Sequence, residues 1–166
     1  LYFPRKIRCP KKAKRQLSER YNQQIDTMNW GDLDFWEKEL NMDLWDLKHT
    51  AKDLAKLHPH TVKFLRFLKD NGKRVYLVTA ADPKDIQFKI SDKNISLYFD
   101  GIFSQVVLGA SKEKEEFWKL LKKKIDFQNE TTMLVEDNPK ILNTAKTFGI
   151  KWLVFKTLSN SEKDED

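Results

Sequence analysis

Short apolar runs alternate with helical segments along residues 58–155, and this alternation constrains the fold more than any other feature of the sequence. The runs at residues 75–78, 102–107, 132–135 and 152–155 are apolar or β-branched, as expected of buried strands. The segments between them carry apolar residues at helical spacing. Strands that alternate with helices are typical of a parallel sheet with crossover helices. The sequence therefore predicts an α/β fold, with a mostly parallel sheet and helices on both of its faces.

The N-terminal third has only helical periodicity. Ala13, Leu17, Tyr21, Ile25 and Met28 form one apolar stripe, and shorter stripes follow at residues 33–40 and 44–54. We therefore expect residues 1–56 to form a basic arm followed by a small all-helical unit, and residues 57–158 to form the α/β core. Residues 159–166 are polar and largely acidic, with too few apolar groups to offset the entropy of ordering, so we expect a disordered tail.

Composition excludes several classes of protein. With 166 residues and 40% hydrophobic content, the chain can form one domain with a core, or a core with a small appendage. Its single cysteine, Cys9, excludes an internal disulfide framework, and no apolar stretch reaches the roughly 18 residues of a membrane span. We therefore expect a cytoplasmic protein with no membrane partner.

Positive charge is concentrated at the N-terminus. The first 15 residues contain seven lysines and arginines and no acid, whereas the whole chain has a net charge of +6. The basic arm between Arg5 and Arg15 can bind phosphate backbones, or it can be ordinary solvated surface. We favour the second interpretation and do not expect nucleic acid as a partner. The arm is no signal peptide, because no apolar segment of roughly 7 to 15 residues follows the charges.

Two adjacent acids, Glu136 and Asp137, end the apolar run at residues 132–135. Ligands of open α/β sheets bind at the carboxyl ends of the strands, so these carboxylates are candidate ligands for a divalent cation. An alternative is an acidic helix N-terminus, in which Asn138 is the cap and Pro139 stands in the first turn.

Two further polar residues belong with these acids. Thr79 follows the run at residues 75–78, and Lys112 is expected at the start of a helix. A hydroxyl donor, a fixed positive charge and a carboxylate-bound cation together satisfy the oxygens of a phosphoryl group. Taken singly, Thr79 can be a turn residue and Lys112 one of many surface lysines.

These residues resemble the sequence motifs of the haloacid dehalogenase superfamily of phosphohydrolases. By this resemblance, Thr79, the backbone N–H of Ala80 and Lys112 bind the substrate phosphate, and Asp137 and Glu136 form the magnesium (Mg²⁺) site. The resemblance further implies a Rossmann-like core, with the preceding helical unit as a cap that closes over the active site.

One branch of the superfamily is similar over residues 19–155. Residues 32–36, 57–61 and 98–104 look like segments of the bacterial GMP/IMP 5′-nucleotidases. This similarity implies a small phosphorylated metabolite as substrate, with a purine nucleotide as the candidate. Relatives often have asparagine after the motif threonine, whereas this chain has Ala80, which weakens the substrate assignment more than the chemistry.

The motif of the superfamily's nucleophile, Asp-x-Asp-Gly-Thr, is absent from the sequence. Asp32 and Asp34 have the spacing, but no apolar strand precedes them, and we assign them to the cap. In the family's strand order, the missing strand would lie between the strands that end at Thr79 and Asp137. Its loss would leave a gap of twice roughly 4.8 Å in the middle of the sheet. The sequence begins with Leu1 rather than Met, and we expect the missing strand upstream in a longer protein.

The resemblance thus implies a magnesium-dependent phosphomonoester hydrolase that acts through an aspartyl-phosphate intermediate. Two alternatives remain open at this stage. The first is a catalytically inactive domain that binds phosphate or a partner, and the second is a nucleic-acid-binding module that uses the basic arm. Trp30, Trp36 and Trp45 can stack on a purine, although aromatic residues at helical spacing more often belong to a core.

Overall fold

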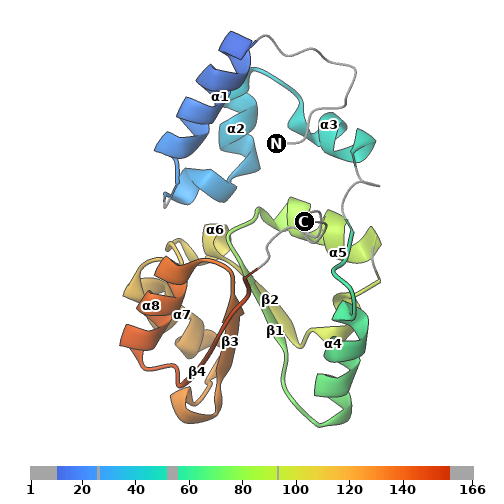
Figure 1. Cartoon of the computed structure of the whole chain (residues 1–166), viewed down its shortest axis with the longest axis vertical. Helices are drawn as coiled ribbons and strands as arrows, with labels where there is room; N and C mark the ends of the chain where they lie inside the picture. The colour runs from blue at the N-terminus through green and yellow to red at the C-terminus, as the bar shows by residue number, and fades with distance from the viewer. Residues whose placement is uncertain (1–10, 26, 52–55, 93, 158–166) are drawn as a thin grey trace.

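The N-terminal part of the molecule is helical. The computed structural model describes residues 11–25, 27–51, 56–92 and 94–157 of the chain. The expected basic arm and C-terminal tail therefore lie largely outside the described residues, and the expected division at residues 56 and 57 stays a prediction. The elements of this part, which lies at the top of Figure 1, are α1 (Lys11–Gln23), η1 (Met28–Gly31), α2 (Leu33–Leu40) and α3 (Leu44–Thr50).

The helical stripe expected from Ala13 to Met28 is interrupted. Helix α1 ends at Gln23. The Thr27 hydroxyl then donates to the Gln24 carbonyl at 2.8 Å, and the Asn29 side-chain amide donates to the Gln24 side chain at 3.0 Å. These local bonds stabilise a turn in place of further helix, because short polar side chains compete with the backbone for its hydrogen-bonding groups.

Aspartate side chains cap the first turns of the next two helices. The inner faces of these helices carry buried leucines. Asp32 accepts a hydrogen bond from the Phe35 N–H at the start of α2, and Asp43 accepts one from the Asp46 N–H at the start of α3. The core of this part consists of Leu33, Trp36 and Leu44, each no more than 7% exposed. Asp32 and Asp34 thus lie at the beginning of a helix, and no strand precedes them among residues 11–25 and 27–31.

Helices and strands alternate in the remainder, which confirms the predicted α/β class. The elements follow in the order α4 (Thr61–Asp70), β1 (Tyr76–Thr79), α5 (Pro83–Asp92), η3 (Ser96–Tyr98), β2 (Gly101–Ser104), α6 (Gln105–Leu108), α7 (Glu115–Ile125), η4 (Asn129–Thr131), β3 (Met133–Glu136), α8 (Pro139–Phe148) and β4 (Trp152–Phe155).

The strand expected at residues 102–107 is shorter than its apolar run. Strand β2 ends at Ser104, whose hydroxyl accepts a hydrogen bond from the Val106 N–H and begins α6. The capped turn overrides the β propensity of Val106 and Val107, and Val107 is 71% exposed on the helix. The prediction of a strand across residues 105–107 was therefore wrong.

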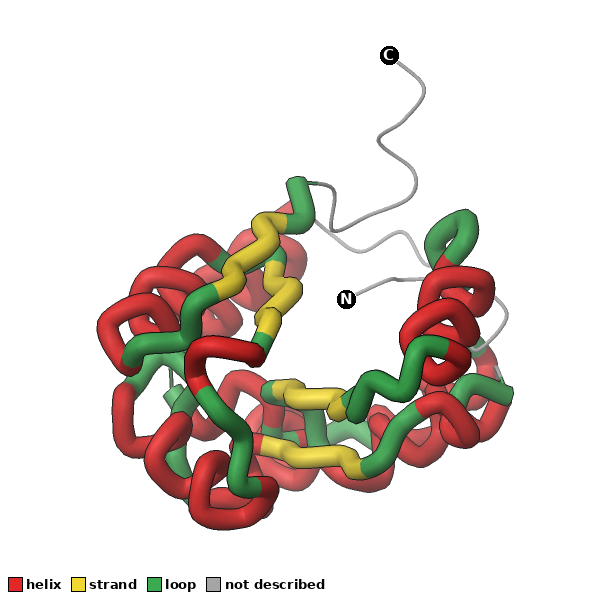
Figure 2. Tube along the Cα trace, turned by 90° about the horizontal axis from the view of Figure 1, so that it is seen from below, coloured by secondary structure: helices red, strands yellow, loops and turns green. Residues whose placement is uncertain are grey.

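The four strands in the described ranges form two separate parallel pairs. Strand β1 pairs with β2, with Tyr76 opposite Gly101, and β3 pairs with β4, with Met133 opposite Trp152. Figure 2 shows the two pairs as separate groups of strands. Among the described residues, no strand joins β1 to β3. This is the arrangement expected of a parallel sheet without its central strand.

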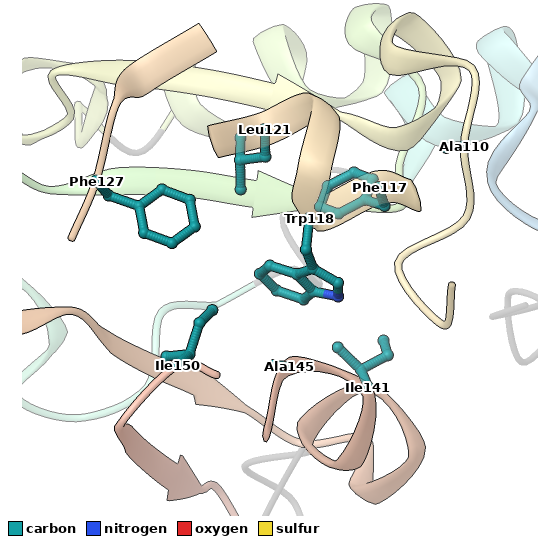
Figure 3. Close-up of a cluster of buried hydrophobic side chains, with 8 residues drawn as sticks. All are labelled: Ala110, Phe117, Trp118, Leu121, Phe127, Ile141, Ala145 and Ile150. Carbon is teal, nitrogen blue, oxygen red and sulfur yellow. The ribbon is translucent and has the colours of Figure 1, made fainter. Parts of the chain in front are cut away.

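A single apolar cluster connects the two strand pairs. Helix α7 contributes Phe117 and Trp118, which are at most 1% exposed, and α8 contributes Ile141 and Ala145 (Figure 3). Val78 of β1 and Leu134 of β3 both pack against this cluster. The two pairs are therefore positioned by a shared core, although no backbone hydrogen bonds link them.

The other face of the β3–β4 pair is exposed. Met133 and Val135 of β3 alternate with the more buried Leu134, and Trp152 and Val154 lie beside them on β4. These four side chains are 44–55% exposed. No helix in the described ranges is long and apolar enough to cross a lipid bilayer.

Candidate active site

A cavity of about 560 Å³ lies between the helical part and the carboxyl ends of β1 and β3. The helical part contributes mostly apolar side chains, including Tyr21, Trp30 and Trp36. The opposite wall is polar. All five predicted site residues line it, namely Thr79, Ala80, Lys112, Glu136 and Asp137. Parallel strands ending at one edge bring these residues together from three separate segments of the chain.

Thr79 is the last residue of β1, and a tight turn follows it. Its hydroxyl oxygen accepts a hydrogen bond from the Ala81 N–H at 3.1 Å. Gly31 of η1 lies directly against this turn, since a Cβ atom on Gly31 would stand 1.8 Å from the Ala80 carbonyl oxygen. The helical part therefore closes on the turn after β1 at a point where only glycine fits.

Lys112 lies in the loop between α6 and α7. This corrects the prediction of a helix start, because α7 begins only at Glu115. The residue is 6% exposed, and its Nζ lies 2.6 Å from Glu136 Oε2 and 3.5 Å from the Val78 carbonyl oxygen. The indole of Trp118 donates to the Lys112 carbonyl at 3.0 Å, so the core helps to hold this loop.

Glu136 and Asp137 have different environments. Glu136 Oε1 accepts hydrogen bonds from the N–H groups of Asp137 and Asn138 at 3.1 and 3.2 Å, and its Oε2 pairs with Lys112. Asp137 is exposed, and its carboxylate has no hydrogen bond or ion pair with any described residue. Asn138 caps α8 by accepting from the Lys140 N–H, with Pro139 in the first turn. The capping interpretation thus holds for Asn138, whereas Asp137 is left to face the cavity.

Comparison with known proteins identifies the family. The family model of haloacid dehalogenase-like hydrolases matches residues 11–149. The chain belongs to this hydrolase family. It is 28% identical to the GMP/IMP nucleotidase YrfG of Escherichia coli over 152 residues, which cover 92% of this chain and 68% of that protein.

Solved structures confirm the haloacid dehalogenase-like fold. A HAD phosphatase from Thermococcus onnurineus has a TM-score of 0.77 at 18% identity, covering 92% of this chain and 72% of that one. The L-2-haloacid dehalogenase from Xanthobacter autotrophicus with chloropropionic acid covalently bound has a TM-score of 0.63 at 16% identity, covering 90% of this chain and 64% of that one.

The carboxylates of this haloacid dehalogenase-like chain offer few free oxygens to a cation. Among the described residues there is no group of three or more His, Cys, Asp or Glu that could hold a metal ion. Both oxygens of Glu136 accept hydrogen bonds, so of the two predicted ligands only the Asp137 carboxylate keeps oxygens without a described partner. Magnesium often keeps several waters and takes one or two carboxylates with substrate phosphate oxygens, so a single carboxylate such as that of Asp137 would be compatible with it.

Sequence reasoning missed a charged cluster in the cavity wall. Asp85 of α5 lies 2.6 Å from Lys48 Nζ of α3 and 3.0 Å from Lys89 Nζ. Burial raises the pKa of Asp85, but the two lysines outweigh this effect and leave the pKa below its usual value. The cluster links the helical part to the α/β part of the hydrolase fold. In the sequence, Asp85 shows only as an acid in the first helical turn after Pro83. Acids are common in the first turn of any helix, so this position alone does not predict the cluster.

The three tryptophans of the helical part have separate roles. Trp36 is 7% exposed, stacks with Tyr21 at 5.8 Å between ring centroids, and donates its indole N–H to the Trp30 carbonyl. Trp45 packs against Phe88 and does not line the main cavity. Trp30 lines that cavity and is 39% exposed. Of the three, only Trp30 combines an exposed ring with a place in the cavity wall.

Proposed function

We propose that this chain binds a phosphomonoester in the cavity, with the phosphate group at the carboxyl end of β1. The observation that carries the proposal is the convergence of a hydroxyl, a turn and a buried ammonium group on one cavity wall. Thr79 and the backbone of Ala80 would donate hydrogen bonds to two phosphate oxygens. Lys112 would supply the fixed positive charge, with Glu136 holding its ammonium in place.

Magnesium is the proposed metal, and Asp137 is its proposed ligand. The ion would neutralise negative charge on the phosphate oxygens, which is the chemistry that phosphoryl transfer requires. Glu136 would act as a positioning residue for Lys112, because its oxygens already accept three hydrogen bonds. A direct bond from Glu136 to magnesium is the other arrangement that the sequence predicts.

A nucleoside monophosphate is the proposed substrate class. The name of the Escherichia coli relative points to GMP and IMP, and Trp30 offers an exposed ring in the apolar wall of the cavity. An aromatic ring there would stack on a purine base, which has a π face on both sides. Tyr21 lies 6.0 Å from the Trp30 ring and would support it.

Hydrolysis would need a nucleophile that the described residues do not provide. Three of the four carboxylates in the cavity wall are engaged: Asp85 with lysines, Glu113 with Ser111, and Glu136 with Lys112. The fourth is the proposed metal ligand, Asp137. We propose that a carboxylate outside this sequence would attack the phosphorus and form the aspartyl-phosphate that water then hydrolyses.

The lack of a free carboxylate in the described cavity wall favours a second candidate function. With Asp137 as a metal ligand, the chain by itself would bind a phosphorylated ligand without hydrolysing it. The nucleic-acid alternative is tested separately, since it predicts binding to DNA that falls steeply as salt rises. Lys11 and Arg15 lie on the exposed surface of α1, and the rest of that arm lies largely outside the described residues.

Calorimetric titration of the chain with GMP, with and without Mg²⁺, tests the proposal. We expect Thr79→Val to weaken GMP binding by about tenfold, as for the loss of one charge-assisted hydrogen bond. Asp137→Asn should abolish the gain in affinity from Mg²⁺. Thr131→Val, a threonine outside the cavity, is the matched control. Equal affinity for GMP and guanosine would refute phosphate binding, and release of phosphate from GMP would separate a hydrolase from the binding-only alternative.

A further inference from the structure

Two ammonium groups in the cavity wall share one carboxylate. Lys48 Nζ of α3 lies 2.6 Å from Asp85 Oδ1, and Lys89 Nζ of α5 lies 3.0 Å from Asp85 Oδ2. Within the described residues, no other acid lies within ion-pair distance of either lysine. The carboxylate therefore balances only one of the two positive charges, and the other is left in excess on the cavity wall.

The carboxylate of this Lys48–Asp85–Lys89 cluster is buried, whereas its two lysine side chains are partly exposed. The Asp85 side chain is 7% exposed, and those of Lys48 and Lys89 are 33% and 56% exposed. All three residues line the cavity. An ammonium group has three N–H donors and no acceptor, and a single carboxylate oxygen lies against each. Donors of both lysines therefore remain available to a ligand in the cavity.

The cluster is displaced from the proposed phosphate site along helix α5. This helix begins at Pro83, four residues after Thr79 at the end of β1. Asp85 lies in its first turn, and Lys89 lies about 6 Å farther along the helix axis. Helix α3, which carries Lys48, lies beside α5 on the right of Figure 1. The cavity thus offers a phosphate site at Thr79 and, away from it, a second group of donors on α3 and α5.

Two neighbouring groups that can only donate are complementary to an edge with two acceptors. The 6-oxopurines guanine and hypoxanthine carry adjacent acceptors at O6 and N7, and lysine is one of the side chains that proteins use to bind this pair in guanine. Adenine has the N7 acceptor but an amino donor in place of O6, so an ammonium group there would face another donor. The excess positive charge also favours the partial negative charge of a carbonyl oxygen.

We propose that the Lys48–Asp85–Lys89 cluster selects a 6-oxopurine base over a 6-aminopurine base. Lys48 and Lys89 would donate to O6 and N7, and Asp85 would position both ammonium groups. The inference rests on the proposed function, because it takes the ligand to be a nucleoside monophosphate whose phosphate lies at Thr79. GMP and IMP share the O6–N7 edge, so the cluster would accept both and discriminate against AMP.

Calorimetric titration with IMP and AMP, in the presence of Mg²⁺, tests this selection. The two nucleotides differ only at N1 and C6 of the base. We expect IMP to bind at least about tenfold more tightly than AMP, as for a base edge read by two donors. Lys89→Met should bring the ratio of the two affinities close to one, chiefly by weakening IMP binding. Lys89→Arg keeps donors at this position and should retain most of the preference.

Lys119→Met is the matched control. Lys119 pairs at 2.9 Å with an acid four residues before it, as Lys89 does, and its side chain is 61% exposed. It lies on α7 and does not line the cavity, so its loss should leave the ratio of IMP to AMP affinity unchanged. Exposed pairs of this kind contribute little to stability, and we expect both variants to fold. If Lys89→Met shows a collapsed melting temperature, Lys48→Met is measured in its place.

Inosine and adenosine separate this inference from the proposed function. If IMP binds more tightly than inosine but no more tightly than AMP, phosphate binding stands and selection by the cluster is overturned. If IMP binds no more tightly than inosine, phosphate binding fails, whereas a preference for inosine over adenosine that Lys89→Met removes would still support the cluster. Equal weakening of IMP and AMP in Lys89→Met would make Lys89 a structural residue and overturn the inference. No binding of any of the four ligands would overturn both proposals.

Discussion

The ammonium group of Lys112 is buried, and it forms an ion pair with the Glu136 carboxylate. Glu136→Gln would leave that charge uncompensated, because the side chains of Lys112 and Glu136 are only 8% and 9% exposed. We expect the variant to lose about 3 kcal/mol of unfolding free energy, a typical cost for breaking a buried pair. Urea unfolding followed by tryptophan fluorescence measures this loss.

The double variant Lys112→Met/Glu136→Gln is the control for this loss. It removes the charge as well as its partner, so it should recover part of the stability lost in Glu136→Gln alone. If the unfolding free energies lost in the two single variants simply added up in the double variant, the two side chains would not interact. Phosphate binding should be absent from the double variant even though it folds, because no ammonium group would remain at the site.

Asp85 makes the stability depend on pH. Its pKa is lowered in the folded chain, so its ion pairs stabilise the fold above the unfolded pKa of about 4, and this contribution is lost as the pH falls further. The difference in unfolding free energy between the unmodified chain and Asp85→Asn should therefore be largest at pH 7 and shrink below about pH 4. Thermal unfolding from pH 3 to pH 7 measures it.

Asp34 provides a matched comparison for Asp85. It also faces a lysine across the boundary between the helical part and α5, with Lys84 Nζ at 3.7 Å, but its side chain is 63% exposed. An exposed pair of this kind contributes little to stability. Asp34→Asn should therefore change stability by less than about 0.5 kcal/mol at any pH in this range. A larger effect at Asp34 than at Asp85 would contradict the role of burial.

At the scale of elements, Gly31 determines how closely η1 approaches the turn after β1. A methyl group on Gly31 would stand 1.8 Å from the Ala80 carbonyl oxygen, so one of the two segments must move in Gly31→Ala. We expect η1 to withdraw from this turn and GMP affinity to fall by roughly tenfold. Hydrogen exchange of η1 and α2 amides should become faster.

Gly72→Ala is the control for the Gly31 experiment. Nothing lies within 4 Å of a Cβ atom at Gly72, although its φ of +65° disfavours a side chain. This substitution should cost about 1 kcal/mol through backbone strain and leave η1 unaffected. If both variants changed the exchange of η1 equally, a general loss of stability would explain the result, and the contact at Ala80 would not.

Local signals were enough to predict several elements. Strand β4 coincides with its apolar run, and β3 is displaced by one residue from the run at residues 132–135. Helix α8 begins after the Asn138 cap and ends before Gly149, whose φ is +101°. Each of these boundaries depends on residues that are adjacent in the sequence. The convergence of the predicted site residues also followed, because strands of a parallel sheet end at the same edge.

Other features depend on contacts between distant segments and could not be read locally. The hydroxyl of Ser104 accepts from the Val106 N–H and also donates to the Ala81 carbonyl, so the end of β2 is determined together with the turn after β1. Gly31 and Asp85 acquire their roles only when the helical part meets α5 and β1. No periodicity in the sequence encodes these encounters.

At the scale of the whole molecule, the bare face of the β3–β4 pair sets the tendency to associate. Met133, Val135, Trp152 and Val154 are 44–55% exposed and contiguous, and contiguous apolar surface favours association more than scattered residues do. We expect the chain to self-associate through this face as its concentration rises. Trp152→Lys should reduce association, measured by sedimentation velocity, and should change stability little because the side chain is 55% exposed.

Val107→Lys is the control, since Val107 is 71% exposed on α6, apart from this face. An equal reduction by both variants would point to added charge as the cause, because each introduces one lysine, whereas a reduction confined to Trp152→Lys would locate the association at the bare face.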